Sequence, residues 1–306
     1  MPLLSFLMPV KDGAAFIGEA VGSLQTQFLR DWELVVVDDH SRDETARLVS
    51  VIGESDARVM LTKNPGNGQV QAINHGYGFC RGEYLKVMDA DDLLAPAFSD
   101  AFSRLRAFEA SYHDALLLAA GTDARTRLRV GGRFARLDFE ASLRRIMVSP
   151  PRWSWTLARR VADGVFPLPS ELPSPHEDVF MGLLIKRNAR VEYVPEPLYV
   201  YRQHAGQFYG GLFNYSPVAV VRRAEAMLRI IDLVGSSDLV RDAEDTAGLL
   251  APSRTYYALM SRERLGWADI LGARLDPVKK ARVAVVRKMP RAAAWLSRRR
   301  AVRKAK

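Results

Sequence analysis

The chain has 306 residues, 48% of them hydrophobic and 26% charged, which is typical of a soluble globular protein with room for one large domain and an appendage. Its formal net charge of +9 arises in residues 279–306, which hold 12 Lys and Arg and no acid. The remaining 32 basic and 35 acidic residues argue against a nucleic-acid-binding face. The single cysteine excludes an internal disulfide, and because neither a signal peptide nor a long apolar stretch is evident, we expect a cytoplasmic protein without a membrane span.

Strand and helix patterns alternate through the first 92 residues. Apolar runs predict strands at 3–8, 33–37, 59–61 and 84–88. Helical spacing predicts helices at 14–27, 41–52 and 69–81. Such alternation predicts an α/β fold with a parallel sheet built from right-handed βαβ units.

The strand at 84–88 ends in three acids, Asp89, Asp91 and Asp92. Ligands of open α/β sheets bind beyond the carboxyl ends of the strands. Two carboxylates about 4 Å apart repel by roughly 4 kcal/mol, and a hard divalent cation removes that repulsion while sharing its shell with phosphates. Asp89 and Asp91 therefore indicate a metal–diphosphate anchor. The alternative is a strand end where Asp92 caps the next helix and the other two acids are solvated.

Several short motifs accompany this cluster in a fixed order. They are Met8-Pro9-Val10, Val35-Val36-Val37-Asp38-Asp39-His40-Ser41-Arg42-Asp43, Asn74-His75-Gly76, Gly82-Glu83-Tyr84 and Met88-Asp89-Ala90-Asp91-Asp92. With these motifs, residues 3–92 resemble the nucleotide-binding half of the family 2 glycosyltransferases, which are inverting enzymes. The resemblance implies the GT-A fold, with a mostly parallel central sheet flanked by helices.

The resemblance also implies roles for individual residues. Pro9 and Val10 would border the nucleotide base, and Asp39 would hydrogen-bond the base or ribose. Asp89 would serve the ribose, and Asp91 would be the more direct ligand of Mn²⁺ or Mg²⁺. Two further residues, Asp12 and Asn74, fall in the same predicted nucleotide site, although Lys11-Asp12 stands where the family commonly has Tyr-Asn. A small base pocket with Asp39 suits the uracil of a UDP-sugar, while dTDP and GDP remain open.

The segment 96–215 is expected to form the acceptor-binding half. It begins with a predicted helix at 96–109 and a strand at 114–120, followed by an arginine-rich loop or hairpin at 121–137. Trp153 and Trp155 lie in a proline-rich turn, and their rings could stack on an acceptor sugar or pack in the core.

The segment His176-Glu177-Asp178 opens a predicted helix, where the helix dipole by itself favours acids. The resemblance implies that a carboxylate at this place deprotonates the acceptor hydroxyl. We assign this role to Asp178, with Glu177 as second choice, because an Asp with an ordinary pKa of about 4 is ionised at neutral pH. His176 would orient either acid or bind substrate.

Predicted strands at 191–194 and 198–201 lead into Tyr201-Arg202-Gln203-His204. The resemblance implies that His204 reaches the metal or diphosphate, while a lone histidine is otherwise structural or solvated. Arg202 could neutralise the leaving nucleoside diphosphate. The segment Phe208-Tyr209-Gly210-Gly211 suggests a mobile lid.

Helical patterns at 217–234 and 238–264 complete the chain. We therefore divide it into a GT-A domain at 1–215 (halves 1–95 and 96–215), a helical extension at 216–278 and a basic amphipathic tail at 279–306. The tail could lie on anionic lipid at the inner face of a membrane or be a frayed solubilising end.

The predicted activity is metal-dependent transfer of a sugar, with inversion, from a nucleotide sugar to the hydroxyl of a glycan or lipid-linked glycan. Two alternatives remain. A nucleotidyltransferase shares a related sheet but usually has a glycine-rich basic loop after the first strand, where this chain has Lys11-Asp12-Gly13. A non-catalytic scaffold would recruit partners through the basic tail.

Overall fold

The four predicted N-terminal strands all form, and they pair in parallel. The computed structural model describes residues 1–119, 121–144, 149–204, 206, 215–240 and 245–303. The parallel strands are β1 (Leu4–Val10), β2 (Trp32–Asp38), β3 (Val59–Lys63) and β4 (Tyr84–Val87), in the order β3-β2-β1-β4. The helices between them are α1 (Ile17–Gln25), α2 (Thr45–Ser55) and α3 (Gln69–Tyr77). The predicted βαβ arrangement of this half is confirmed.

Side chains of β1 alternate between two cores, one on each face of the sheet. Phe6 and Met8 pack in the core shared with α1, α2 and α4 (Phe98–Leu105), whereas Leu7 packs in the core shared with α3. Burial on both faces explains why the strand is apolar throughout. Gly76 allows α3 to lie close to the sheet, because a Cβ there would come within 2.4 Å of Leu7 and 2.5 Å of Val37.

The second half of the sheet is mainly antiparallel. Its strands are β5 (Leu93–Leu94), β6 (Ala110–Leu118), β7 (Arg125–Leu128), β8 (Trp155–Ala158) and β9 (Val191–Arg202). β8 joins the two halves by pairing with β4 on one side and β6 on the other, and β9 runs parallel to β6. Of the two alternatives at 121–137, the hairpin is confirmed, because β7 pairs antiparallel with β6. The two strands predicted at 191–201 are one, because proline-containing positions 195–197 are accommodated at a register shift.

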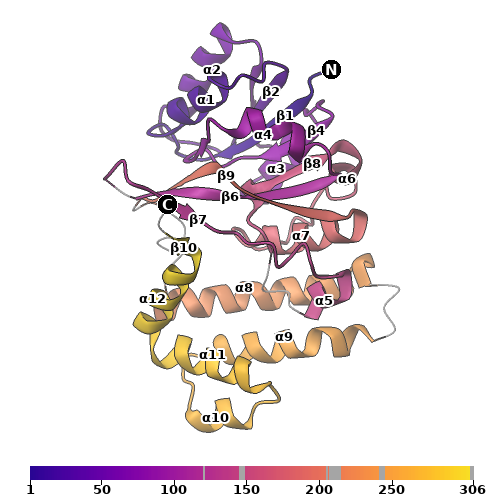
Figure 1. The fold of residues 1–306 in the computed structure, drawn as a ribbon, viewed down its shortest axis with the longest axis vertical. Coiled ribbons are helices and arrows are strands. Elements are labelled where there is room, and N and C mark those ends of the chain that lie inside the picture. The colour runs from indigo at the N-terminus through magenta and orange to yellow at the C-terminus, as the bar shows by residue number, and fades with distance from the viewer. Residues whose placement is uncertain (120, 145–148, 205, 207–214, 241–244, 304–306) are drawn as a thin grey trace.

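The C-terminal helices continue the core on the α3 side of the sheet (Figure 1). The remaining elements are α5 (Phe139–Arg144), η1 (Arg152–Ser154), α6 (Arg159–Asp163), α7 (Glu177–Asn188), α8 (Pro217–Ser236), η3 (Asp238–Val240), α9 (Thr246–Met260), α10 (Trp267–Gly272), α11 (Pro277–Lys288), α12 (Pro290–Ala301) and β10 (Val302–Arg303). Ile230 of α8 and Val283 of α11 are fully buried in the same core as α3. Among the described helices, none is both long and apolar enough to cross a membrane.

Candidate active site

The loops after β1 and β2 lie at one edge of the sheet and are locked together. Asp12 and His40 both have positive φ angles, 51° and 60°, a conformation that side-chain-bearing residues adopt rarely and mainly at functional sites. Asp12 receives a hydrogen bond from the Arg42 backbone at 2.7 Å, and its own N–H donates to Ser41 Oγ at 2.9 Å. Asp12 therefore shapes this edge through contacts within the protein.

Asp39 is buried beside the end of β1. Its N–H donates to the Val10 carbonyl at 2.7 Å, which places it next to the buried Pro9-Val10 segment as the resemblance implies. Its carboxylate accepts hydrogen bonds from Asn64 Nδ2 at 2.6 Å and the Gly68 backbone at 2.9 Å. Asp39 thus holds the loop between β3 and α3 against this edge, and a base bound here would meet a carboxylate already fixed in place.

Asn74 joins α3 to the segment after α6. Its Nδ2 donates to the Leu168 carbonyl and its Oδ1 accepts from the Leu168 N–H, both at 2.7 Å. Because both ends of the amide are used in joining α3 to the segment after α6, the geometry gives no support to a nucleotide contact by Asn74.

Three carboxylates gather directly after β4. Asp89, Asp91 and Asp92 each offer an oxygen within 4.8 Å of the others, and the Asp91 side chain remains 34% exposed. His204 Nε2 lies 2.9 Å from Asp91 Oδ2, so the predicted pair comes together from segments 113 residues apart. Hard carboxylate oxygens with one imidazole form a donor set that fits Mg²⁺ or Mn²⁺.

Asp92 differs from its two neighbours. It is fully buried, and its Oδ1 accepts a hydrogen bond from the Arg202 backbone at 2.7 Å. The N-cap position of α4 is Ala97, so the alternative in which Asp92 caps that helix is wrong. Asp92 instead ties the carboxylate loop to the end of β9. Burial raises the pKa of Asp91, with a further contribution from the Asp89 carboxylate, whereas the contact with His204 lowers it.

Arg152 joins this cluster to the acid pair of α7. One Nη donates to Asp89 and the other to Glu177, and the side chains of Arg152 and Glu177 are only 7% and 2% exposed. The sequence analysis did not identify Arg152. The only local signal was an arginine between two prolines and a tryptophan, which by itself has no functional meaning.

Asp178 is partly exposed beside this ion pair, and its backbone carbonyl accepts a hydrogen bond from Ser149 Oγ at 2.8 Å. Burial raises the pKa of Asp178 to about 8, and the neighbouring Glu177 carboxylate adds to the shift. The expectation of an ordinary pKa near 4 is therefore wrong for the ligand-free protein. Burial, together with Arg223, lowers the pKa of His176 to about 4, so His176 is neutral at pH 7.

The two tryptophans are core residues. Trp153 is 3% exposed and stacks on Tyr199 with ring centroids 4.9 Å apart, while Trp155 is 1% exposed and donates to the Pro150 carbonyl. A ring without an exposed face cannot stack on a sugar, so the predicted acceptor contact by Trp153 or Trp155 is wrong for this conformation.

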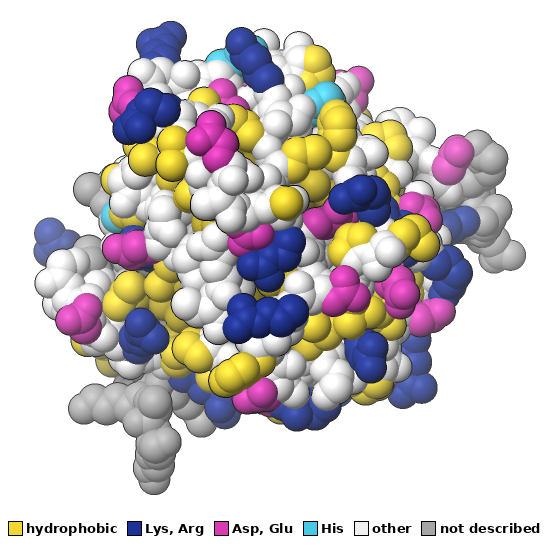
Figure 2. All heavy atoms as spheres, turned by 90° about the horizontal axis from the view of Figure 1, so that it is seen from above, with side chains coloured by type: hydrophobic (Ala, Val, Ile, Leu, Met, Phe, Trp, Pro, Cys, Tyr) yellow, Lys and Arg dark blue, Asp and Glu magenta, His cyan; other side chains and the backbone are white. Residues whose placement is uncertain are grey.

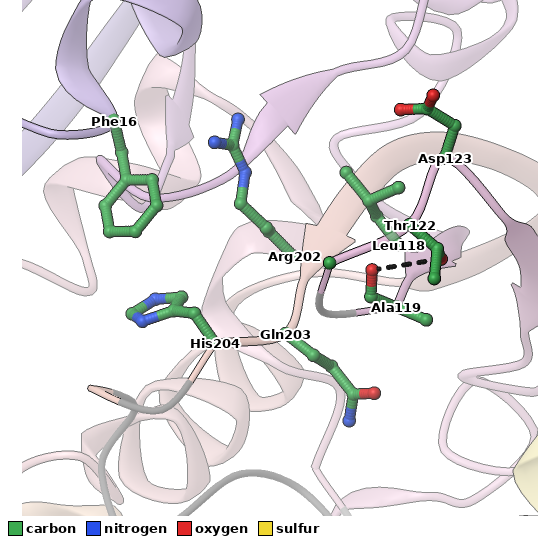
Figure 3. Close-up of a pocket in the computed structure, with 9 residues that line it drawn as sticks. Phe16, Leu118, Ala119, Thr122, Asp123, Arg202, Gln203 and His204 are labelled. Atoms are coloured by element: carbon green, nitrogen blue, oxygen red, sulfur yellow. Dashed lines mark hydrogen bonds between the residues drawn. The ribbon is translucent and has the colours of Figure 1, made fainter.

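A pocket of about 420 Å³ adjoins the carboxylate cluster at His204 (Figure 3). Figure 3 shows the Phe16 ring flanked by Arg202 and His204, with centroid distances of 5.1 Å to the guanidinium and 4.6 Å to the imidazole. Arg202 also forms an ion pair with Glu19 at 2.8 Å, so its positive charge is partly compensated. The predicted lid at 208–211 lies outside the described residues.

Fold and site together define a nucleotide-diphospho-sugar transferase architecture. Residues 5–115 match glycosyl transferase family 2, which confirms the resemblance found in the sequence. The O-antigen biosynthesis protein RfbC of Myxococcus xanthus is 35% identical over 98 residues, which are 31% of this chain and 8% of that protein. The chain covers between 8% and 52% of the curated relatives described for it.

Solved structures confirm the GT-A fold over nearly the whole chain. S. aureus TarS 1-349 in complex with UDP-GlcNAc has a TM-score of 0.60 at 16% identity, covering 98% of this chain and 92% of that one. The mannosyltransferase PcManGT from Pyrobaculum calidifontis, in complex with GDP-Man and Mn²⁺, has a TM-score of 0.59 at 17% identity, covering 97% and 79%. The predicted fold class, including the helical C-terminal region, is thus confirmed.

Proposed function

We propose that this protein is an inverting glycosyltransferase that moves a sugar from a nucleotide sugar, with UDP as the expected carrier, to an acceptor hydroxyl. The observation that carries the proposal is the continuous link from Asp91 and Asp89 through Arg152 to Glu177 and Asp178. This link supports a single site in which Asp89 and Asp91 bind the cation and Asp178 accepts the proton. Relatives and neighbours that act in O-antigen synthesis or bind UDP-GlcNAc and GDP-Man support the class of donor.

In the proposed reaction the Asp178 carboxylate accepts the proton of the acceptor hydroxyl. The acceptor oxygen then forms a bond to the anomeric carbon from the face opposite the diphosphate, and the bond from that carbon to the diphosphate oxygen breaks. The nucleoside diphosphate leaves with the electron pair, so the anomeric configuration inverts. Asp91 and His204 would hold Mn²⁺ or Mg²⁺, which supplies Lewis acidity to the departing diphosphate when bound.

A single displacement needs no nucleophile on the enzyme, and the one cysteine is consistent with this. Cys80 is buried, and its Sγ lies 3.5 Å from the Gly76 carbonyl. Burial raises the pKa of Cys80 to about 12, so the thiolate needed for covalent catalysis is not formed at neutral pH.

The test is a panel of UDP-, dTDP- and GDP-sugars with and without Mn²⁺, read by thermal shift and by release of the nucleoside diphosphate. We expect stabilisation and slow donor hydrolysis with one nucleotide, both dependent on the cation. Release of pyrophosphate from a nucleoside triphosphate and a sugar phosphate would instead indicate a nucleotidyltransferase. A chain that neither binds nor turns over any member of the panel would support the scaffold alternative.

We also propose that the C-terminal helices rest on an anionic membrane surface. Of the 13 large hydrophobic side chains exposed in the described part of the chain, six lie within residues 267–296, among them Trp267, Leu271 and Trp295. Residues 279–306, which contain or follow these side chains, hold 12 Lys and Arg and no acid of their own, although Lys279 pairs with Asp276. By contrast, Figure 2 shows acidic and basic side chains interspersed at the end of the molecule that carries α1 and α2. Exposed aromatic groups with unopposed positive charge favour lipid headgroups.

Sedimentation with neutral and anionic phospholipid vesicles at low and high salt tests this docking. We expect binding to anionic vesicles alone, weakened by salt and by the double substitution Trp267→Ser/Leu271→Ser. The matched control is Phe28→Ser, whose parent side chain is 80% exposed in the other half of the chain. Equal binding to both vesicle types, or none, would contradict the proposal.

A further inference from the structure

Arg152 occupies the centre of the site without being free to bind a substrate phosphate. Both of its terminal nitrogens donate to carboxylates, one on Asp89 and one on Glu177, which lie 63 residues before it and 25 residues after it in the chain. Its side chain is 7% exposed. A planar guanidinium fixes two partners at once in a way that a point charge does not. The contacts therefore set how the carboxylate loop after β4 lies relative to the start of α7.

The backbone next to Arg152 accepts hydrogen bonds from a buried lysine, Lys86. Lys86 of β4 is fully buried, and its Nζ lies 2.6 Å from the Trp153 carbonyl and 3.4 Å from the Trp155 carbonyl. A third contact, at 2.8 Å, is to Nε2 of His113. His113 Nδ1 lies 2.8 Å from the Asp114 carbonyl, and because a carbonyl oxygen can only accept, Nδ1 carries the proton. This leaves Nε2 as an acceptor for Lys86.

Lys86 and Asp89 lie three positions apart in the chain and contact the same short segment. Lys86 fixes the main chain at residues 153–155, and Asp89 is fixed by the side chain that extends from 152. The segment is therefore attached at one point to β4, through Lys86, and at a second point to the loop after β4, through Asp89. The other Nη of Arg152 reaches Glu177. A buried lysine in a strand is costly to keep, which is a reason to expect a specific task for it.

We infer that Arg152 is a positioning residue that fixes the metal-side carboxylate Asp89 at a set distance from the Glu177-Asp178 pair, and that Lys86 holds the segment from which Arg152 extends. The inference rests on the proposed function for its catalytic consequence. A base displaced by about 1 Å from its reacting partner costs roughly 10²-fold in rate. The role of Arg152 is thus to keep the donor and acceptor sides in register.

The first test is Arg152→Lys, which keeps the charge but cannot hold two carboxylates at once. We expect kcat for transfer or donor hydrolysis to fall on the order of 10²-fold, with the KM for the donor changed by less than about threefold. The matched control is Arg160→Lys. Arg160 lies in α6, the helix that follows β8, and forms an exposed ion pair with Glu109. A parental kcat in Arg152→Lys overturns the inference.

A second pair of variants separates positioning from stability. Arg152→Met leaves the buried Glu177 without its cation and should lower Tm, whereas Arg152→Met/Glu177→Gln removes the unpaired charge and should recover most of that loss. We expect kcat of the double variant to stay well below that of Glu177→Gln alone, because Asp89 is still unheld. If kcat of the double variant equals that of Glu177→Gln, Arg152 has only a structural role.

The role of Lys86 is tested by Lys86→Met, alone and with Arg152→Lys. If both act through one segment, the double variant should be no slower than the slower single variant, and their Tm changes should likewise fail to add. Effects that multiply in kcat and add in Tm would overturn the coupling. A parent protein inactive with every donor would contradict the proposed function alone, since the coupling of the Tm changes is measured without substrate.

Discussion

The two acidic clusters of the site differ in how their negative charge is compensated. After β4, three carboxylates lie within 4.8 Å of one another, Asp91 is 34% exposed, and His204 Nε2 lies 2.9 Å from Asp91 Oδ2. At the start of α7, Glu177 is 2% exposed and contacts the permanent cation of Arg152. Arg152 contacts both clusters, but the first holds three carboxylates and the second two, so the first has the larger excess of negative charge for an added cation.

Asp178 lies next to Glu177 but does not take its contact with Arg152, and this difference favours Asp178 as the proposed proton acceptor. Its neighbour Glu177 takes the contact with Arg152, so Asp178 feels burial and a second carboxylate more than it feels the cation. A carboxyl group whose proton is held loosely near neutral pH can accept a proton and give it up again. Burial raises the pKa of both acids, that of Asp178 to about 8.

The largest expected effect on catalysis comes from removing the charge of Asp91, in the carboxylate cluster after β4. Asp91→Asn should lower kcat by about 10³-fold, because under the proposed function Asp91 would hold the cation that stabilises the departing diphosphate. It should also abolish the extra thermal stabilisation that Mn²⁺ gives in the presence of the nucleoside diphosphate, and chelation of the cation should reproduce both effects in the parent protein. Asp100→Asn, an exposed acid of α4, serves as the control. Retained cation dependence in Asp91→Asn would remove Asp91 from the metal site.

The next largest effect on catalysis comes from Asp178, in the acid pair at the start of α7. Asp178→Asn should lower kcat by 10²- to 10⁴-fold, the range typical of a lost general base, while nucleotide binding measured by thermal shift is kept. Glu177→Gln is the comparison variant, since it alters the neighbouring carboxylate and leaves Asp178 in place. If Glu177→Gln proves the slower of the two, the roles of the two acids are reversed.

The pH dependence sharpens the same comparison. Because a base must be ionised to act and the pKa of Asp178 is raised to about 8, kcat/KM should rise with pH up to about 8 in the parent protein. Glu177→Gln removes a negative neighbour and should move this rise to lower pH. A rise centred near pH 4 would contradict the raised pKa.

The same shift has a consequence for stability. A carboxyl group whose folded pKa is raised contributes stability below its unfolded pKa of about 3.8, and this contribution is lost as pH rises through about 8. Asp178→Asn should therefore be more stable than the parent protein at pH 8 and above, and the difference should disappear towards pH 4. Equal Tm values across this range would show that Asp178 is well solvated.

The sequence predicted the carboxylate cluster after β4 more fully than the contacts of the acid pair at the start of α7, for physical reasons. Asp89 and Asp91 follow a strand whose apolar run identifies it, and the carboxyl ends of parallel strands meet at one edge whatever the details of packing. His204 required the resemblance, but its motif is local. The helix that begins at Glu177 was likewise readable from its spacing.

Features that depend on burial were not readable in this way. Trp153 and Trp155 could not be assigned to core or surface before β8 was known to lie between β4 and β6. The link from Asp89 to Arg152 spans 63 residues and leaves no local pattern. The pKa of Asp178 follows from its surroundings, so an ordinary value was the natural and incorrect expectation.

The smallest effect on catalysis should come from Trp153, which follows Arg152 in the chain. Trp153→Phe shortens a ring that stacks on Tyr199 with an angle of 2° between planes, so we expect a loss of about 1–3 kcal/mol of stability and a lower Tm. The backbone carbonyl of residue 153 still accepts from Lys86, so kcat and the KM for the acceptor should stay near their parental values. Trp295→Phe, at a side chain that is 57% exposed, should change neither stability nor KM. If Trp153→Phe instead raised the KM for the acceptor tenfold with no change in Tm, the ring would have to turn outward when the acceptor binds. Trp153 would then belong to the acceptor site and not to the core.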